Sequence, residues 1–352
     1  MFFGYPIAAA AENWLHECLC EMVLTVHASL EAGEDVSDWP AIIPAAHRAQ
    51  LRPRWGLRDR IQAYAVAAAG LTAEQLVQVE VCLIQQNDIA DLLSCAGDCE
   101  VIADLPAAIR TPAEDLFTFA FELLDDLGIR DTQYQQIYAV INPAVCPFCG
   151  SEYFDHPQSH REDLDHYLAK TIYPFAAANL RNLSPMGKKC NGYKLQQDVL
   201  RDAAGLRRQS FDPYGNHNLR VSLINSVPFG GFEDQIPQWQ IDFIPDSPEC
   251  VTWDAVFSLR ERIRNDTLNK SFGSWLRQFA VWFRRRKGLA DLTDAKILES
   301  VREYKEDLEI QGFEARLFLR FRVFEMLEAY CKQGHERLIE LLRDVIMNAV
   351  TS

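Results

Sequence analysis

An acid and an imidazole stand side by side in the stretch LDHYLAK, Leu164 to Lys170, in a chain with only eight histidines. A neutral imidazole can take a proton from water at neutral pH, so His166 has the chemistry of a general base. Divalent cations prefer oxygen ligands, so Asp165 has the chemistry of a metal ligand. An isolated Asp-His dipeptide is usually an ordinary surface pair, and hydrolysis is indicated only if further residues complete the site.

Three cysteines around this pair have the spacing of a metal site. Cys146 and Cys149 form a CxxC, whose tight turn points two thiolates at one place, as a tetrahedral zinc requires. Cys190 follows 41 residues after Cys149, in front of a helix-forming segment. The other seven cysteines lie mostly in apolar or helical surroundings and are interpreted as small buried hydrophobic residues in a reducing compartment.

The order of these motifs resembles the HNH endonucleases of the ββα-metal type, in their zinc-stapled branch. The CxxC is followed by Asp165-His166, by Asn182 in RNL, and by Asn191 directly after Cys190. The resemblance covers about 70 of the 352 residues. A later segment, FDPYGN at 211–216, is similar to an aromatic-proline segment that often follows this core.

The resemblance implies roles for five residues. Asp165 and Asn191 are expected to hold a catalytic Mg²⁺ or Mn²⁺, with His166 as the general base. Asn182 is expected to hydrogen-bond across the loop and fix the backbone that presents His166. Lys194, one turn beyond Asn191, is expected either to contact a phosphate or to be a solvated helix charge. Because neighbours in a strand point to opposite faces, Asp165 and His166 converge only if the hairpin bends or a facing helix contributes.

The zinc knuckle departs from the family pattern at position 187. The second knuckle would ordinarily carry a cysteine there, and this chain has Gly187. The resemblance therefore implies a structural zinc held by three cysteines, one ligand short of a tetrahedron. A water, His156 or His160 in the intervening loop could complete the set, although both histidines also fit as ordinary loop residues.

The net charge of −15 is unevenly distributed. Residues 1–145 hold 7 basic and 21 acidic residues, residues 146–220 hold 10 and 8, and residues 221–352 hold 18 and 21. The acidic N-terminal part is not expected to touch nucleic acid and is interpreted as a docking surface for a protein partner, or as a shield over the nuclease. No apolar run reaches the length of a membrane span and the N-terminus lacks a basic leader, so we expect a cytoplasmic protein that does not insert in membranes.

The pattern predicts a mostly α-helical protein with a small α+β centre. Residues 1–140 form an acidic helical region, 141–216 the nuclease core, and 217–352 a short β-hairpin followed by helices. Predicted helices include 8–30, 72–95 and one opened by Thr111-Pro112 that continues to Gly128. Predicted strands are Leu219–Asn225 and Trp239–Pro245.

A basic and aromatic segment lies between Arg260 and Lys287. Arg284, Arg285 and Arg286 are candidates for contacts with a nucleic-acid backbone. The same segment also fits an amphipathic helix whose aromatic residues face a core and whose arginines favour its C-terminus.

These features predict a metal-dependent DNA endonuclease that leaves 5′-phosphate and 3′-hydroxyl ends. By analogy, small HNH nucleases with large flanks resemble effector subunits of bacterial anti-phage defence systems, paired with an ATPase or sensor subunit. Two alternatives stay open: a non-catalytic zinc or nucleic-acid-binding module, and an RNase that uses the same centre.

Overall fold

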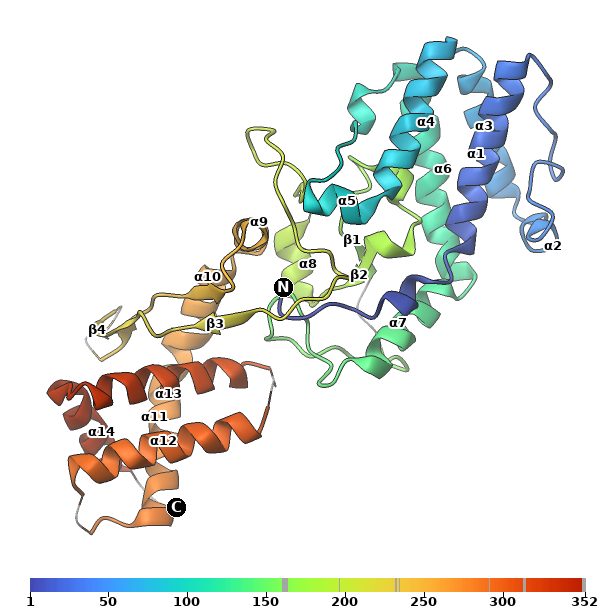
Figure 1. Cartoon of the computed structure of the whole chain (residues 1–352). Helices are drawn as coiled ribbons and strands as arrows, with labels where there is room; N and C mark the ends of the chain where they lie inside the picture. Colours follow the sequence, from blue (N-terminus) through green and yellow to red (C-terminus); the bar gives the residue numbers. More distant parts are fainter. Residues whose placement is uncertain are drawn as a thin grey trace.

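The computed structural model describes residues 1–159, 164–195, 197–231, 233, 235–290, 292–312 and 315–349. Over these residues the protein is mostly helical, with three small antiparallel strand pairs, as the sequence predicted for its fold class. Figure 1 shows the N-terminal helices at one end, the C-terminal helices at the other, and the short strands between them.

The N-terminal helices pack around the long helix α6, Ala107–Asp126. Its buried residues recur every three or four positions, which gives it one continuous apolar stripe. Around it lie α1 (Trp14–Ala32), α2 (Arg48–Leu51), α3 (Trp55–Ala68), α4 (Ala73–Asn87), α5 (Ile89–Ser94) and α7 (Ile129–Val140), with short 3₁₀ turns at Ile7–Ala10 and Ile102–Asp104.

Three predicted helix boundaries were wrong. The first helix begins at Trp14 rather than residue 8, after a 3₁₀ turn. The predicted helix 72–95 is interrupted at Asp88, where the Asn87 side chain donates back to the Leu83 carbonyl and competes with the helical hydrogen bond. Helix α6 begins at Ala107, before Thr111, because burial of Ile109 outweighs the cost of Pro112 inside the helix. Thr72 caps α4, with the reciprocal bonds to Gln75 of a capping box.

A buried histidine makes the N-terminal helices sensitive to acid. His16 on α1 is 4% exposed and packs on the ring of Phe117, and its burial lowers its pKa from 6.5 to about 4. The unfolded chain takes up this proton near pH 6.5 and the folded chain only near pH 4, so stability present above pH 6.5 is lost as the pH falls between these values. When the pH is lowered from 7 to 5, we expect the unfolding free energy of the wild type to fall by about 2 kcal/mol more than that of His16→Gln. Urea unfolding at both pH values measures this, and equal losses would contradict the assignment.

The centre of the chain forms a two-stranded hairpin followed by a helix. Strand β1 (Leu164–His166) pairs antiparallel with β2 (Leu183–Pro185), and α8 (Lys188–Lys194) follows directly. The loop between the strands contains 3₁₀ turns at Pro174–Ala176 and Leu180–Asn182.

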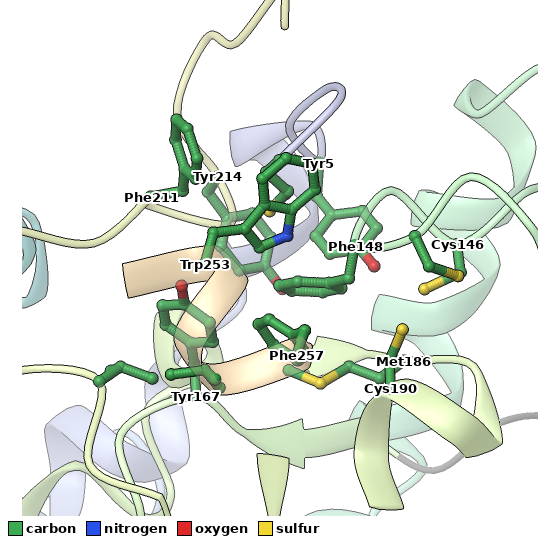
Figure 2. Close-up of a cluster of buried hydrophobic side chains, with 14 of the residues drawn as sticks. Tyr5, Cys146, Phe148, Tyr167, Met186, Cys190, Phe211, Tyr214, Trp253 and Phe257 are labelled. Atoms are coloured by element: carbon green, nitrogen blue, oxygen red, sulfur yellow. The ribbon is translucent and has the colours of Figure 1, made fainter. Parts of the chain in front are cut away.

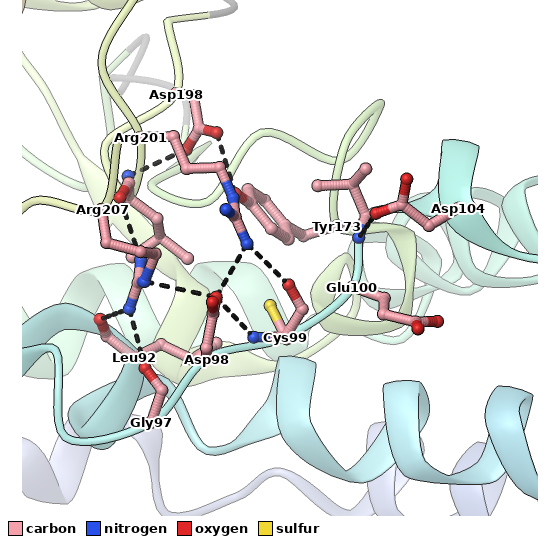
Figure 3. A network of polar contacts seen from close by, with 12 residues as sticks. Leu92, Gly97, Asp98, Cys99, Glu100, Asp104, Tyr173, Asp198, Arg201 and Arg207 are labelled. Carbon is pink, nitrogen blue, oxygen red and sulfur yellow. Dashed lines mark hydrogen bonds and ion pairs between the residues drawn. The ribbon is translucent and has the colours of Figure 1, made fainter. Parts of the chain in front are cut away.

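Polar contacts join this centre to the N-terminal helices. Arg207 donates to the carbonyls of Leu92 and Gly97 at 2.7 and 2.9 Å. Arg201 donates to Asp98 at 2.8 Å, and Figure 3 shows both guanidinium groups converging on this carboxylate. The segment after α8 is therefore held against the loop that follows α5.

Two further strand pairs follow the centre. Strand β3 (Arg220–Ser222) pairs with β6 (Asp242–Ile244), within the two segments that the sequence predicted as strands. The chain between them adds a second pair, β4 (Val227–Gly230) with β5 (Pro237–Gln238).

The C-terminal helices surround an aromatic core. The rings of Phe279, Tyr304 and Phe324 lie 4.7–5.5 Å apart and join three helices. The elements are α9 (Pro248–Phe257), α10 (Leu259–Arg262), a π-helical turn at Ile263–Leu268, α11 (Asn269–Lys287), α12 (Asp294–Ile310), α13 (Leu317–Lys332) and α14 (Glu336–Asn348). The chain breaks between α11 and α12, and Thr293 caps the second of these helices.

Candidate functional site

The hairpin and helix place the predicted residues on consecutive elements. In the register of β1 and β2, Asp165 lies opposite Ser184 and His166 opposite Leu183. Asn182 is the last residue before β2, and Asn191 lies within α8. The order strand, strand, helix is therefore present, and only Met186 and Gly187 separate β2 from α8.

Asn182 makes the hydrogen bonds across the loop that the sequence predicted. Its side chain is fully buried; its Oδ1 accepts from the Leu168 amide at 2.6 Å, and its Nδ2 donates to the carbonyls of Leu168 and Ala176 at 3.0 and 3.1 Å. Its own carbonyl accepts from the Tyr167 amide at 2.8 Å. These bonds hold the backbone immediately after His166, and they satisfy every polar group of a side chain that would be costly to bury unpaired.

The ring of His166 is held in one tautomer. Its Nε2 lies 3.0 Å from the carbonyl oxygen of Ala177, and because a carbonyl only accepts, Nε2 carries the proton. Nδ1 is then the nitrogen that can accept a proton. Burial, followed by the charge of Lys170, lowers the pKa of His166 to about 3, so the ring is neutral at physiological pH.

The surroundings of His166 contain residues that sequence reasoning missed. Phe121 of α6 packs on the imidazole, with ring centroids 4.2 Å apart, and His166 is only 7% exposed. The cationic groups of Arg130 and Lys170 lie 4.6 and 5.3 Å from the centroid of the Phe121 ring. Lys170 ends the LDHYLAK stretch and its charge could have been noticed, whereas nothing local in the sequence points to Phe121 or Arg130.

Asp165 faces the other side of the hairpin from His166. Its carboxylate oxygen lies 3.2 Å from Nζ of Lys194 on α8. The Lys194 side chain is 1% exposed, and burial lowers its pKa while Asp165 partly offsets this effect. Residues three apart share a helix face, so Asn191 lies on the side of α8 that presents Lys194 to Asp165. The expectation of a solvated helix charge at Lys194 was wrong, because this side chain is buried against the Asp165 carboxylate. Asp165 and His166 keep the opposite directions of neighbours in a strand.

The three predicted cysteines meet in one cluster. The sulfur atoms of Cys146, Cys149 and Cys190 all lie within 4.8 Å of one another, and all three residues are buried. The turn that brings the first two together has the amide of Gly150 donating to the Cys146 carbonyl at 2.8 Å, with Gly150 at a φ of +62° that favours glycine. A cluster of three buried thiols at this spacing could hold a metal ion.

Aromatic side chains from distant segments pack beside the cluster. Figure 2 shows Tyr5, Phe148 and Phe257 beside the cysteines, brought together from the N-terminal segment, the knuckle and α9. Tyr5 also donates to the Pro185 carbonyl, and Phe2 donates its amide to the Pro147 carbonyl at 3.0 Å. The first residues of the chain therefore pack directly on the knuckle.

Other predicted residues lie away from these groups. The ring of His156 packs on Tyr138, 5.6 Å between centroids, and within the described residues the metal-competent cluster contains cysteines only. His160 lies outside the described residues. Sequence reasoning missed two residues that do contact the cysteines, Glu152 and Arg262. Glu152 lies three residues after the CxxC, so its carboxylate could have been recognised from the sequence as a candidate ligand. Arg262 is 72 residues from Cys190, and no local pattern connects the two.

The basic end of α11 is engaged within the C-terminal helices. Arg286 pairs with Asp307 at 3.0 Å, and Arg284 donates to the Ala349 carbonyl. Arg285 also has a partner in the structure. The helix runs from the centre toward the far end of the C-terminal helices in Figure 1, and its buried aromatic residues fit the amphipathic interpretation.

No protein-family model, curated protein or solved structure matches this chain in the comparisons. Among the described residues, no helix has the length and apolar character needed to cross a membrane. The site is therefore defined by its own geometry: a hairpin and helix that carry Asp165, His166 and Asn191, next to a buried three-cysteine cluster able to hold a metal.

Proposed function

We propose that this chain is a metal-dependent endonuclease of the HNH type that hydrolyses phosphodiester bonds of DNA. The observation that carries the proposal is the position of His166: a hairpin strand presents it, Asn182 locks the backbone behind it, and the Ala177 carbonyl holds the tautomer that a general base needs. This use of three separate backbone and side-chain constraints on one imidazole supports a catalytic role.

The donor sets fit two different metals. Asp165 and Asn191 offer hard oxygen ligands, which suit Mg²⁺ or Mn²⁺, and an ion at this carboxylate would replace the ammonium group of Lys194 that pairs with it. The three thiols suit zinc, which would fasten the knuckle to α8. A divalent ion held by Asp165 and Asn191 would supply charge stabilisation for the phosphate and the leaving oxygen. Because Asp165 faces the other side of the hairpin from His166, the hairpin would have to bend for both side chains to act on one phosphate.

His166 would carry the proton transfer. Nδ1 takes one proton from water while the water oxygen bonds to phosphorus and the bond from phosphorus to the 3′-oxygen breaks. The 3′-oxygen then gains a proton from solvent, which leaves 5′-phosphate and 3′-hydroxyl ends. The cations Lys170 and Arg130 are near the base and would attract the phosphodiester backbone. The ring of Phe121 packs on His166, so this side chain of α6 has to move away before a substrate can reach the imidazole.

The purified full chain tests this proposal with a supercoiled plasmid. We expect nicking or linearisation with Mg²⁺ or Mn²⁺ and none when these ions are left out or chelated by EDTA. The variant Phe121→Ala uncovers His166 and is expected to cleave faster than the wild type. Cleavage of single-stranded RNA in place of DNA would favour the RNase alternative. If neither the wild type nor Phe121→Ala, both folded and loaded with metal, cleaves the plasmid or RNA, the proposal of an enzyme is contradicted and the non-catalytic module is favoured. The burial of His166 and the ion pair between Asp165 and Lys194 also fit such a module.

We keep as a prediction that a protein partner, such as an ATPase or sensor subunit of an anti-phage defence system, binds the acidic N-terminal region. The cytoplasmic location also stays a prediction. DNA contact by Arg284, Arg285 and Arg286 also stays a prediction, and it would require their present ion pairs and hydrogen bonds to be exchanged for phosphate contacts.

A further inference from the structure

We propose that Glu152 is the fourth ligand of the zinc held by Cys146, Cys149 and Cys190, with Arg262 as the cation that offsets the charge of this set. The inference rests on the zinc site proposed above and names the ligand that takes the place of the cysteine missing at position 187. Three thiolates leave a tetrahedral zinc with one open position, which structural sites fill with a protein ligand.

The carboxylate of Glu152 occupies the place where a side chain at position 187 would begin. A Cβ added to Gly187 would lie 2.6 Å from Oε2 of Glu152 and 2.9 Å from its carboxyl carbon. The φ of Gly187 is −58°, which any residue adopts, so the backbone conformation itself does not call for glycine. Glycine at this position therefore makes room for the carboxylate. Glu152 fills the space that the side chain of a cysteine at position 187 would need.

The contacts of Glu152 hold its carboxylate toward the cysteines. Oε2 lies 3.9 Å from the sulfur of Cys149, and Oε1 accepts from the amide of Lys189 at 3.3 Å. Its backbone carbonyl accepts from the Cys146 amide at 2.8 Å. Sulfur and oxygen ligands of one tetrahedral zinc, at about 2.3 and 2.0–2.2 Å from the metal, are about 3.5 Å apart. Oε2 is within about half an ångström of this separation for Cys149. Among the described residues only the three sulfur atoms lie within 4.8 Å of one another, so the Glu152 carboxylate has to turn toward Cys146 and Cys190 when the metal binds.

Arg262 supplies the charge that such a set needs. Its Nη1 and Nη2 lie 3.4 and 3.5 Å from the sulfur of Cys190, and Nη2 lies 3.9 Å from Oε2 of Glu152. Zinc with three thiolates and one carboxylate carries a formal charge of −2, which is costly in a buried site unless a cation is near. The Arg262 side chain is 8% exposed, so its guanidinium group is buried together with the cluster.

A narrow crevice connects the same groups to the surface. Its volume is about 20 Å³, space for about one water molecule, and Cys149, Glu152 and Arg262 line it. A metal ion would reach the sulfur atoms past the carboxylate. The crevice also gives the fourth ligand room to move when the ion is bound.

Zinc affinity and cobalt spectra of the full chain test the assignment. We expect the wild type to bind one zinc per chain and Glu152→Ala to bind it at least about 10–100-fold more weakly, the loss that even supporting residues of metal sites give. Competition with a chromophoric chelator measures this ratio. In the double variant Glu152→Ala/Gly187→Cys the clash at 187 is removed, so a fourth thiolate should restore tight binding. With Co²⁺ its d–d bands should move to longer wavelength than those of the wild type, because thiolate replaces oxygen. The rescue also shows that alanine at position 152 is compatible with the folded chain.

The outcomes separate the fourth ligand from the zinc site itself. Wild-type zinc affinity and an unchanged cobalt spectrum in Glu152→Ala would overturn the role of Glu152. Loss of affinity in His156→Ala or His160→Ala would assign the position to a histidine instead. A wild type that binds no zinc after incubation with it would overturn the zinc site as a whole, whatever the plasmid assay shows.

Discussion

Replacing His166 by alanine is expected to slow DNA cleavage by about 10²–10⁴-fold, the usual contribution of a positioned general base. The Ala177 carbonyl and Asn182 orient this imidazole so that Nδ1 accepts the proton of the attacking water, and alanine cannot accept it. Initial rates of plasmid nicking in Mg²⁺ measure the effect, with metal ligands and zinc site unchanged.

His27→Asn is the matched control for His166→Ala. His27 is also a buried histidine, 1% exposed, and its Nε2 lies 2.9 Å from the hydroxyl of Tyr64, on helices remote in sequence from the hairpin. We expect this variant to lose stability but to keep the cleavage rate per folded molecule. Equal rates in His166→Ala and the wild type would remove His166 from the mechanism, even if the chain proved to be a nuclease.

Replacing Asp165 by alanine is expected to cost about 3 kcal/mol of unfolding free energy, in addition to abolishing cleavage. The variant leaves the ammonium group of Lys194 buried without the carboxylate that lies 3.2 Å from it. The estimate is at the lower end for a buried pair because the Asp165 side chain is 20% exposed and water can partly replace it. Urea unfolding measures the loss, and a change below about 0.5 kcal/mol would show that the pair contributes little.

A double variant separates the folding role of Asp165 from its catalytic role. In Asp165→Asn/Lys194→Met no charge stays buried, so we expect stability within about 1 kcal/mol of the wild type. Cleavage should stay lost, because an amide is a poor replacement for a carboxylate at a divalent metal. A double variant that regains cleavage together with stability would show that Asp165 only supports the fold.

Much of the local structure followed from the sequence. β3 and β6 form within the two segments predicted as strands, where alternating apolar residues meet polar turns. A CxxC turn brings two thiols together by its own geometry, and Cys190 was expected to join them because of the resemblance to the zinc-stapled HNH core. Pro112 shows the limit of such reasoning, since burial of the stripe on α6 decided where that helix begins.

The sequence by itself determined which residues have the chemistry: Asp165, His166, Asn182 and Asn191 in one short region, and three cysteines around them. Only the tertiary structure decided what each of them meets. It placed Phe121 on His166, Lys194 on Asp165, Glu152 in the space beside Gly187, and Arg262 on Cys190. The physical reason is that residue type and local spacing set what a side chain can bond to, whereas burial and charge depend on segments far away in the chain, and their contacts exist only once the helices have packed.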